Sequence, residues 1–225
     1  MKSPCILLII VCTLSLTGCA STKQADSDSS LGKAQQTLDS LYQHYSAKDS
    51  YLLRESYPFD EQHKVTYLAS EDQANTPNQF SYLWPYSGTF SAVNALFEAT
   101  HDKKYQKLLD KRVLPGLEEY FDIQRTPNAY SSYIQTAPTS DRFYDDNVWL
   151  GIDFTDIYQI TQEKRYLDKA QLIWKFIESG TDSLLGGGIY WCEQKKESKN
   201  TCSNAPGSVL ALKPVSYTHL RAHET

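Results

Sequence analysis

The chain has 225 residues and a formal net charge of −5, and its aromatic residues include 16 Tyr and 4 Trp against a single Met. The mildly acidic balance argues against nucleic acid as a partner, because phosphate backbones are bound by clusters of Lys and Arg. Many aromatic residues fall beside turn signals, and exposed rings of this kind commonly form sugar-binding platforms.

The N-terminal segment 1–18 has the pattern of a bacterial lipoprotein signal peptide. Lys2 is followed by the apolar run CILLIIVCTLSL and by LTGC, which resembles a lipobox with Cys19 as the lipidated residue. A transmembrane anchor is the alternative, but the run is shorter than the roughly 20 residues that a span needs. We therefore expect a membrane attachment through acyl chains on Cys19 and a flexible tether over 19–30. The expected location is the bacterial cell envelope, at the outer membrane or cell surface.

The C-terminal residues do not have the character of natural protein sequence. The string VSYTHLRAHET (215–225) is similar to one translated frame of a transposase sequencing adapter, and the codon for Pro214 would also be partly adapter. We interpret residues 214–225 as an artefact, with a genuine tail as the alternative. On this interpretation the natural sequence is interrupted after Lys213.

Helical periodicity of the apolar residues predicts five helices and the start of a sixth. The predicted helices cover 31–45, 87–100, 105–120, 147–161 and 166–177, and the last begins at Ala205. The stretch 50–85 is less regular. No stretch alternates apolar and polar residues for long, and GGGIYW is the only short β-like run, so the predicted fold class is all-α.

Two helix–helix turns are similar in sequence, HDKKY (101–105) and QEKRY (162–166), which are 61 residues apart and each preceded by Thr. This indicates an internal repeat of helical hairpins. Such hairpins can close into an α/α toroid or stack as an open solenoid. The spacing favours the toroid, because open arrays keep periods of about 34 residues. It also leaves long loops, 121–143 and 180–205, to build a site at one rim.

Asp145 and Asp146 lie in RFYDDNVWLGIDFTDIY, where an aromatic-rich loop becomes a helix. Two carboxylates about 5 Å apart are what a retaining glycosidase needs, one as nucleophile and one as general acid/base. The helix N-terminus favours one ionised carboxylate, and mutual repulsion is expected to raise the pKa of the other. The structural alternative is that Asp145 caps the helix and Asp146 faces water. For Asp141, Asp153 and Asp156 we expect solvated or hydrogen-bonded structural roles.

Several side chains near this doublet are candidates for contact with a sugar ring. They are Trp84, Tyr86, Tyr130, Tyr133, Tyr144, Asn147, Trp149, Tyr190 and Trp191. We expect about half of the aromatic candidates to belong to the core instead. Tyr190 and Trp191 follow Gly186–Gly188, and glycines let the backbone approach a ligand closely. An ordinary tight connection is an equal interpretation of these glycines.

Cys192 and Cys202 are the only cysteines of the mature chain besides Cys19. An exported protein meets an oxidising compartment, so we expect a disulfide that closes WCEQKKESKNTC. The five histidines are scattered, and His219 and His223 belong to the excluded segment. The sequence has too few ligands for a metal site and too few histidines for a Ser-His-Asp arrangement, and no Gly-rich phosphate loop follows a strand. No cofactor is therefore expected.

Four segments together resemble glycoside hydrolase family 76. They are YLWPYSGTFSAVNALFEATHDKKY, NAYSSYIQ, RFYDDNVWLGIDF and GGGIYWCEQKKESKNTCSNAPGS. The resemblance runs from about residue 80 to 213 and is weaker over 30–80. That family contains bacterial α-1,6-mannanases and folds as an (α/α)6 barrel of about a dozen helices. The resemblance implies that 31–213 is the N-terminal part of a catalytic domain with roughly half of the barrel missing, and we expect this chain by itself to be inactive.

In that family the catalytic aspartates are adjacent in a YDDN-type motif, which here is Tyr144 to Asn147. The resemblance implies that Asp145 is the nucleophile and Asp146 the general acid/base of a retaining hydrolase that cleaves α-1,6-mannan internally. The expected partner is an α-mannan polysaccharide or oligosaccharide. One alternative is a non-hydrolytic mannan-binding surface lipoprotein. Another is a transglycosidase that acts on cell-wall mannan.

Overall fold

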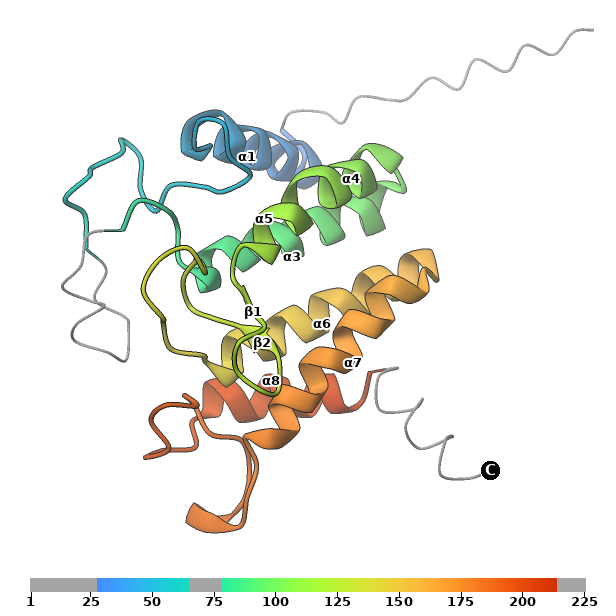
Figure 1. The fold of residues 1–225 in the computed structure, drawn as a ribbon. Coiled ribbons are helices and arrows are strands. Elements are labelled where there is room, and N and C mark those ends of the chain that lie inside the picture. Colours follow the sequence, from blue (N-terminus) through green and yellow to red (C-terminus); the bar gives the residue numbers. More distant parts are fainter. Residues whose placement is uncertain (1–27, 65–77, 214–225) are drawn as a thin grey trace, which may run out of the picture.

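The computed structural model describes residues 28–64 and 78–213, and within them the chain is mostly helical (Figure 1). The long helices are α1 (Ser30–Tyr45), α3 (Leu83–Thr100), α6 (Tyr144–Thr161), α7 (Lys164–Ser179) and α8 (Thr201–Ala211). The predictions for the signal peptide, Cys19 and residues 214–225 lie outside the described residues. In the described ranges, no helix is long and apolar enough to cross a membrane.

The predicted helices are confirmed, with corrections at their ends. The helix predicted from residue 105 is continuous but changes character, through α4 (Lys103–Leu108), the π-helical turn η1 (Leu109–Val113) and α5 (Leu114–Glu118). The helix predicted from residue 147 begins three residues earlier, and α8 begins four residues before Ala205. Both helices begin earlier than predicted, within residues that the sequence assigned to the preceding loops, because apolar periodicity gives no signal there.

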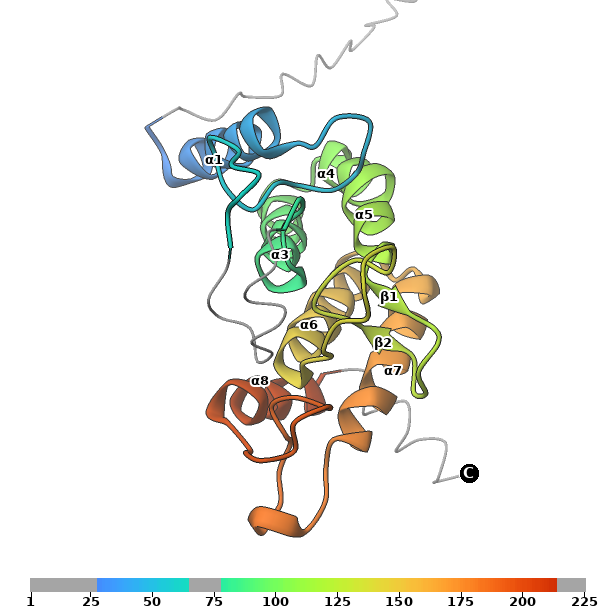
Figure 2. The ribbon, with the colours of Figure 1, turned by 60° about the vertical axis from the view of Figure 1, so that its left-hand side comes forward.

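Helices α3, α6 and α8 lie side by side and run in the same direction (Figure 1). The helix α4–η1–α5 returns antiparallel to α3, and α7 returns antiparallel to α6, so the chain forms successive helical hairpins (Figure 2). Close approach of α6 and α8 depends on Gly151, where an added Cβ would meet Leu210 at 2.6 Å. The parallel arrangement brings the N-termini of three helices to one end of the molecule.

The two similar turns predicted as a repeat have the same structure. His101 and Gln162 both adopt a left-handed conformation at the end of a helix, with φ of 53° and 59°. Each donates its backbone N–H to a carbonyl four residues back. The turns also contact each other, since Gln106 Nε2 donates to Glu163 Oε1 over 2.5 Å. The internal repeat of hairpins is therefore confirmed.

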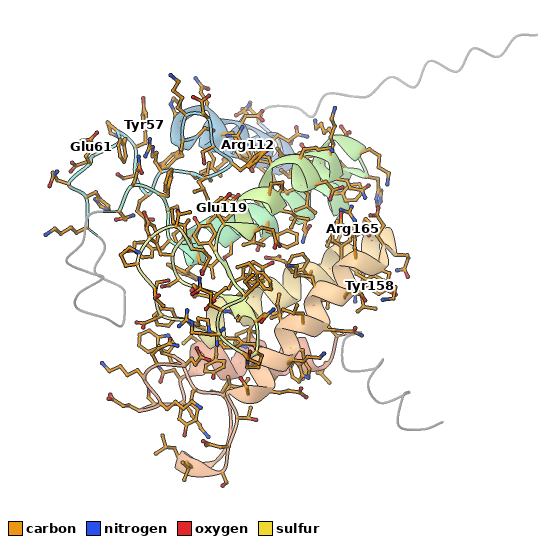
Figure 3. All side chains as sticks on the ribbon, viewed as in Figure 1. Tyr57, Glu61, Arg112, Glu119, Tyr158 and Arg165 are labelled. Carbon is orange, nitrogen blue, oxygen red and sulfur yellow. The ribbon has the colours of Figure 1, made fainter. Side chains whose placement is uncertain are left out.

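Helix α1 is held against the hairpin of α3 and α4–η1–α5 by the π-helical turn. Arg112 in η1 places its guanidinium 4.5 Å from the ring centroid of Tyr42 and donates to the hydroxyl of Ser46. Figure 3 labels Arg112 beside α1. Because the cation lies over an aromatic face as well as against a hydroxyl, the contact fixes both the helix and the chain that leaves it.

The described part of the chain also contains a short sheet that the sequence did not predict. Strand β1 (Phe121–Asp122) pairs antiparallel with β2 (Ala129–Tyr130). The β-like run GGGIYW forms no strand of this sheet and makes only an isolated bridge between Thr181 and Ile189. Gly186–Gly188 all have positive φ, between 85° and 90°, a conformation that glycine adopts without strain.

A buried arginine ties the two long loops together. The side chain of Arg142 is 0% exposed, and its Nε donates to Glu193 Oε2 over 2.7 Å. Its Nη1 lies 3.7 Å from Asp122 Oδ2 and donates to the carbonyl of Pro127 over 2.8 Å. A buried cation costs several kcal/mol unless it is paired and hydrogen-bonded. The network therefore fixes the position of the 121–143 loop against the segment around Glu193.

Replacing Arg142 with Ala is expected to lower the free energy of unfolding by about 3–5 kcal/mol, because Asp122 and Glu193 lose a buried partner. The matched control is Arg165→Ala, since Arg165 pairs with Asp110 and Glu163 at half-exposed positions; its loss should stay within about 1 kcal/mol. Urea unfolding of the two variants measures the difference. Equal losses would contradict the role given to Arg142.

Candidate active site

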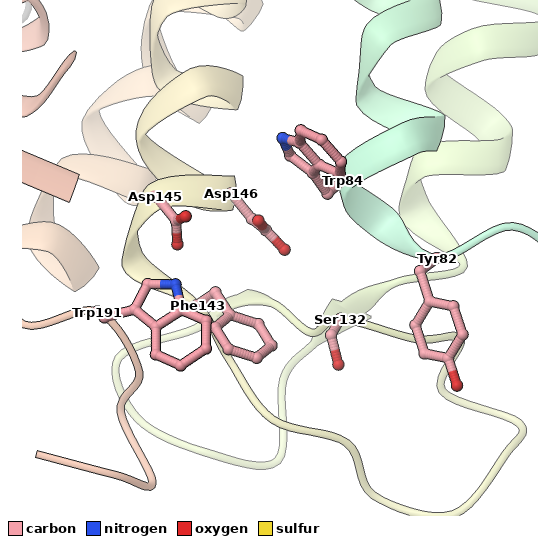
Figure 4. A pocket seen from close by; sticks show the side chains of 7 residues that line it. All are labelled: Tyr82, Trp84, Ser132, Phe143, Asp145, Asp146 and Trp191. Carbon is pink, nitrogen blue, oxygen red and sulfur yellow. The ribbon is translucent and has the colours of Figure 1, made fainter. Parts of the chain in front are cut away.

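A pocket lies at the end of the molecule where the parallel helices begin (Figure 4). Its lining comes from the start of α3, the 121–143 loop, the first turn of α6 and the loop before α8. The lining residues are Tyr82, Trp84, Ser132, Phe143, Asp145, Asp146 and Trp191. The two long loops that were predicted to build a site therefore both contribute to this pocket, and the aspartate doublet lies in it.

The doublet is held in the pocket by its neighbours in the chain. Helix α6 begins at Tyr144, whose backbone N–H donates to the carbonyl of Trp191 over 2.9 Å. The ring of Tyr144 is buried and stacks on Phe176 at 4.6 Å. This anchors the first turn, so that Asp145 and Asp146 face the pocket from the helix N-terminus, where the helix dipole favours a negative charge. The alternative that Asp146 faces water is wrong, since it is 7% exposed.

Asp145 is surrounded by groups that favour its ionised form. Burial raises the pKa of Asp145, but the Cys202 thiol, backbone N–H groups of the first turn and the Trp191 indole N–H oppose that rise by donating to the carboxylate. Figure 4 shows the indole ring of Trp191 beside this side chain. Its Oδ1 is buried and has no hydrogen-bond partner within the described residues. The pKa of Asp145 is therefore raised less than burial alone would raise it, and one carboxylate oxygen is left for another partner.

Asp146 is in the opposite situation. Burial raises the pKa of Asp146 well above its ordinary value, and the charge of Asp145 raises it further. Two neighbouring carboxyl groups whose surroundings separate their protonation states are typical of a nucleophile and an acid. The predicted rise in the pKa of one partner is found at Asp146, and the pKa of Asp145 is raised as well, mainly by burial.

The structure brings two of the predicted aromatic side chains to the doublet. Trp84 is 58% exposed and Trp191 is half-buried, and both line the pocket. Sequence reasoning missed three lining residues, Tyr82, Ser132 and Phe143. They lie in or beside the motifs YLWPYSG, NAYSSYIQ and RFYDDN, but no periodicity in a loop indicates which side chain faces a cavity.

Four predicted substrate contacts are wrong, because their side chains are buried outside the pocket. They are Tyr130, Tyr144, Asn147 and Tyr190. Asn147 clamps strand β2 to α6, since it accepts from the Tyr130 N–H and donates to the Tyr130 carbonyl, both over 2.9 Å. The Tyr190 hydroxyl donates to Asp182. Tyr86 is also buried, and its hydroxyl donates to the carbonyl of Val113.

Two further candidates lie near the pocket without lining it. Tyr133 is half-buried, with its ring centroid 4.7 Å from that of Tyr82, and its hydroxyl accepts the Phe80 N–H. It therefore supports a pocket residue from behind. Trp149 is 46% exposed, one turn beyond Asp145 on α6. Its ring is accessible but is not part of the pocket wall.

The structure contradicts the predicted disulfide. Cys192 and Cys202 are both free thiols, the first buried and the second exposed. Cys192 lies in the segment that bridges to Phe143 and directs its sulfur toward Gln194. Cys202 instead lies in the first turn of α8 and faces Asp145. Within the described residues, no group of three His, Cys, Asp or Glu side chains converges as a metal site.

Comparison with known proteins gives one family. The model described as "Glycosyl hydrolase family 76" matches residues 56–222, so the match includes nine residues beyond Lys213, outside the described residues. No match was found among the curated proteins.

Solved structures match the fold. One is a family 76 mannosidase from Bacteroides thetaiotaomicron VPI-5482, with 30% identity and a TM-score of 0.68, over 84% of this chain and 48% of that one. Another is a family 76 α-mannanase of Bacteroides thetaiotaomicron, with 22% identity and a TM-score of 0.68, over 86% and 50%.

A third match is an inactive α-1,6-mannanase variant from Salegentibacter sp. HEL1_6 in complex with α-1,6-mannotriose. Two adjacent aspartates are replaced by asparagine in that variant. It is 23% identical, with a TM-score of 0.59, over 86% of this chain and 47% of that one. The chain spans about half the length of these structures, and its helical hairpins match roughly half of the (α/α)6 fold.

Among the neighbouring acids, Asp153 has the strongest perturbation. It is buried two turns beyond Asp146 on α6, where its Oδ2 accepts from Ser91 Oγ over 2.8 Å and its backbone carbonyl accepts from Asn94 Nδ2. Burial raises the pKa of Asp153 to about 7. The hydrogen-bonded structural role predicted for Asp153 is confirmed, because it joins α6 to α3 outside the pocket.

Asp153→Asn is expected to change how stability depends on pH. The carboxyl ionises near 3.8 in the unfolded chain and near 7 in the folded one, so the free energy of unfolding of the wild type should fall as pH rises across that interval. The Asn variant lacks this fall, and its stability relative to wild type should therefore rise from pH 4 to pH 7 and then level. Urea midpoints at several pH values measure it, with the exposed Asp168→Asn as control. A pH-independent difference would contradict the assignment.

Proposed function

This chain belongs to glycosyl hydrolase family 76, and from that premise we propose that the intact enzyme is a retaining glycosidase that cleaves α-1,6-linked mannan. The observation that carries the proposal is the doublet in the pocket, where burial raises the pKa of both carboxyl groups, hydrogen-bond donors oppose that rise at Asp145, and the charge of Asp145 adds to it at Asp146. A nucleophile and an acid of a double displacement need these two protonation states.

In the first step, Asp145 attacks the anomeric carbon of the bound sugar. Asp146 gives its proton to the departing glycosidic oxygen, and a glycosyl ester forms on Asp145 as the bond to the leaving group breaks. In the second step Asp146, now ionised, takes a proton from water, and the hydroxide oxygen attacks the anomeric carbon. The ester bond breaks, and the configuration of the sugar is retained.

The substrate class is supported by the chemistry of the pocket. Trp84 and Trp191 flank the doublet with aromatic surface, which suits the apolar faces of a pyranose ring. A similar protein from Salegentibacter sp. HEL1_6 is named as an α-1,6-mannanase, and it binds α-1,6-mannotriose when two adjacent aspartates are replaced. Internal cleavage of the polysaccharide is part of the proposal.

Asp145→Asn and Asp146→Asn in the intact enzyme are each expected to abolish the release of mannooligosaccharides, because one removes the nucleophile and the other the transferable proton. The intact enzyme is obtained by reading the gene past the codon for Lys213. Chromatography of the products from α-1,6-mannan measures activity and also separates hydrolysis from transfer to a sugar acceptor.

The matched control for these two variants is Asp156→Asn. Asp156 lies on the same helix but pairs with Lys213 outside the pocket. It should retain product release, and all three variants should unfold cooperatively. Normal release from either doublet variant would reject the assignment of that residue, while glycan binding without cleavage by the wild type would favour a non-hydrolytic mannan-binding protein.

We also propose that the protein is a lipoprotein of the bacterial cell envelope, attached to a membrane through Cys19. The apolar run and the LTGC sequence that precede the tether support it. Expression with radiolabelled palmitate should label the wild type and leave Cys19→Ala unlabelled, because the thiol is the site of lipid attachment. Equal labelling of both would contradict the proposal.

A further inference from the structure

One buried hydroxyl in the pocket has no hydrogen-bond partner in the part of the chain that the structure describes. Ser132 is 2% exposed and lines the pocket together with Asp146 and Trp84. Among the residues that the structure describes, nothing forms a hydrogen bond with its hydroxyl. A buried hydroxyl without a partner costs free energy, and such groups call for an explanation in a folded protein.

The backbone of Ser132 is fixed on both sides. Its N–H donates to the carbonyl of Asp141 over 2.8 Å, and its carbonyl accepts the N–H of Leu83 over 2.8 Å. Ser132 is therefore tied to Asp141 within the same loop and to the first residue of α3. The hydroxyl can still change position by rotation about χ1, which moves it between staggered rotamers and leaves the backbone in place. Figure 4 places Ser132 between Asp146 and Tyr82.

The preceding residue provides a direct comparison. Ser131 is also buried, but its hydroxyl oxygen accepts a hydrogen bond from Arg125 Nη2 over 2.9 Å. The two adjacent serines thus differ in their hydrogen bonding. The Ser131 hydroxyl stabilises the loop, whereas the Ser132 hydroxyl forms no hydrogen bond with the described residues. A polar group that does not stabilise the fold but lines a ligand pocket is typical of a binding group.

We propose that the Ser132 hydroxyl binds substrate, by a hydrogen bond to a hydroxyl of the mannosyl unit that lies against Asp145 and Asp146. The assignment rests on the proposed function and names a specificity contact within that site. A mannosyl unit inside an α-1,6-linked chain uses its C1 and C6 positions for the linkages, and its C2, C3 and C4 hydroxyls remain. Ser132 would bind one of these three and so select for its configuration.

Ser132→Ala in the intact enzyme should lower kcat/KM on α-1,6-mannooligosaccharides by about 3- to 10-fold, the value of one uncharged hydrogen bond. Its urea midpoint should not fall, because the wild-type hydroxyl forms no hydrogen bond with the residues that the structure describes. Ser131→Ala is the matched control. It should lower the urea midpoint, because Arg125 loses a buried partner.

Substrates that lack one hydroxyl at C2, C3 or C4 identify the contact. With the analogue that lacks the bound hydroxyl, wild type and Ser132→Ala should have the same kcat/KM, and the difference should persist with the other two. Three results would overturn the assignment. They are an unchanged kcat/KM for Ser132→Ala, a lowered urea midpoint for that variant, or a kcat/KM of Ser132→Ala that falls below that of wild type by the same factor with every analogue.

These outcomes are distinguishable from failure of the proposed function. If the wild-type intact enzyme cleaves none of the α-1,6-mannooligosaccharides, the proposed function fails and the Ser132 assignment fails with it. If the wild type cleaves them and Ser132→Ala matches it in every measurement, only the Ser132 assignment fails.

Discussion

The pocket depends on the buried guanidinium of Arg142. An unpaired cation in the interior is costly, so Asp122 and Glu193 must both reach it, and this brings the loop after α5 and the loop before α8 to one place. The backbones of the two loops are also joined at this point, because the Arg142 carbonyl accepts the Glu193 N–H. Phe143 and Trp191 then lie against each other, with ring centroids 5.0 Å apart, and form one wall of the pocket.

The parallel helices supply the other walls. Because α3, α6 and α8 run in one direction, their N-termini converge; α3 and α6 bring side chains to the pocket from their first turns or from the residue just before them, and α8 places Cys202 against Asp145. Trp84, Asp145 and Cys202 occupy corresponding places at the starts of these helices. Trp149 on α6 and Val209 and Leu212 near the end of α8 are exposed hydrophobic side chains. Half of a toroid is expected to leave the inner faces of its helices uncovered in this way.

Chemistry at the doublet follows from an asymmetry in its surroundings. The two carboxyl groups are adjacent in sequence, share one helix turn and are both buried, yet hydrogen-bond donors oppose the rise in pKa at Asp145, whereas the charge of its neighbour adds to the rise at Asp146. Two of these donors, Cys202 and Trp191, come from α8 and from the loop before it, about 50 residues away in the chain. Together with the unpaired Ser132 hydroxyl, this indicates a site where polar groups are arranged for a ligand at some cost in stability.

The sequence by itself determined the helices, the repeated hairpin turns and the position of Asp145 and Asp146 at a helix start, because these depend on side-chain periodicity and on turn residues close in the chain. Only the tertiary structure decided which aromatic rings face the pocket. Tyr82 and Tyr130 look alike in sequence, but Tyr130 is fully buried, with its backbone held by Asn147, whereas Tyr82 lies on the pocket wall. The same holds for Cys192 and Cys202, whose spacing permits a disulfide. Packing against Gln194 and Asp145 directs the two thiols to different partners, since a side chain's neighbours depend on how distant segments pack.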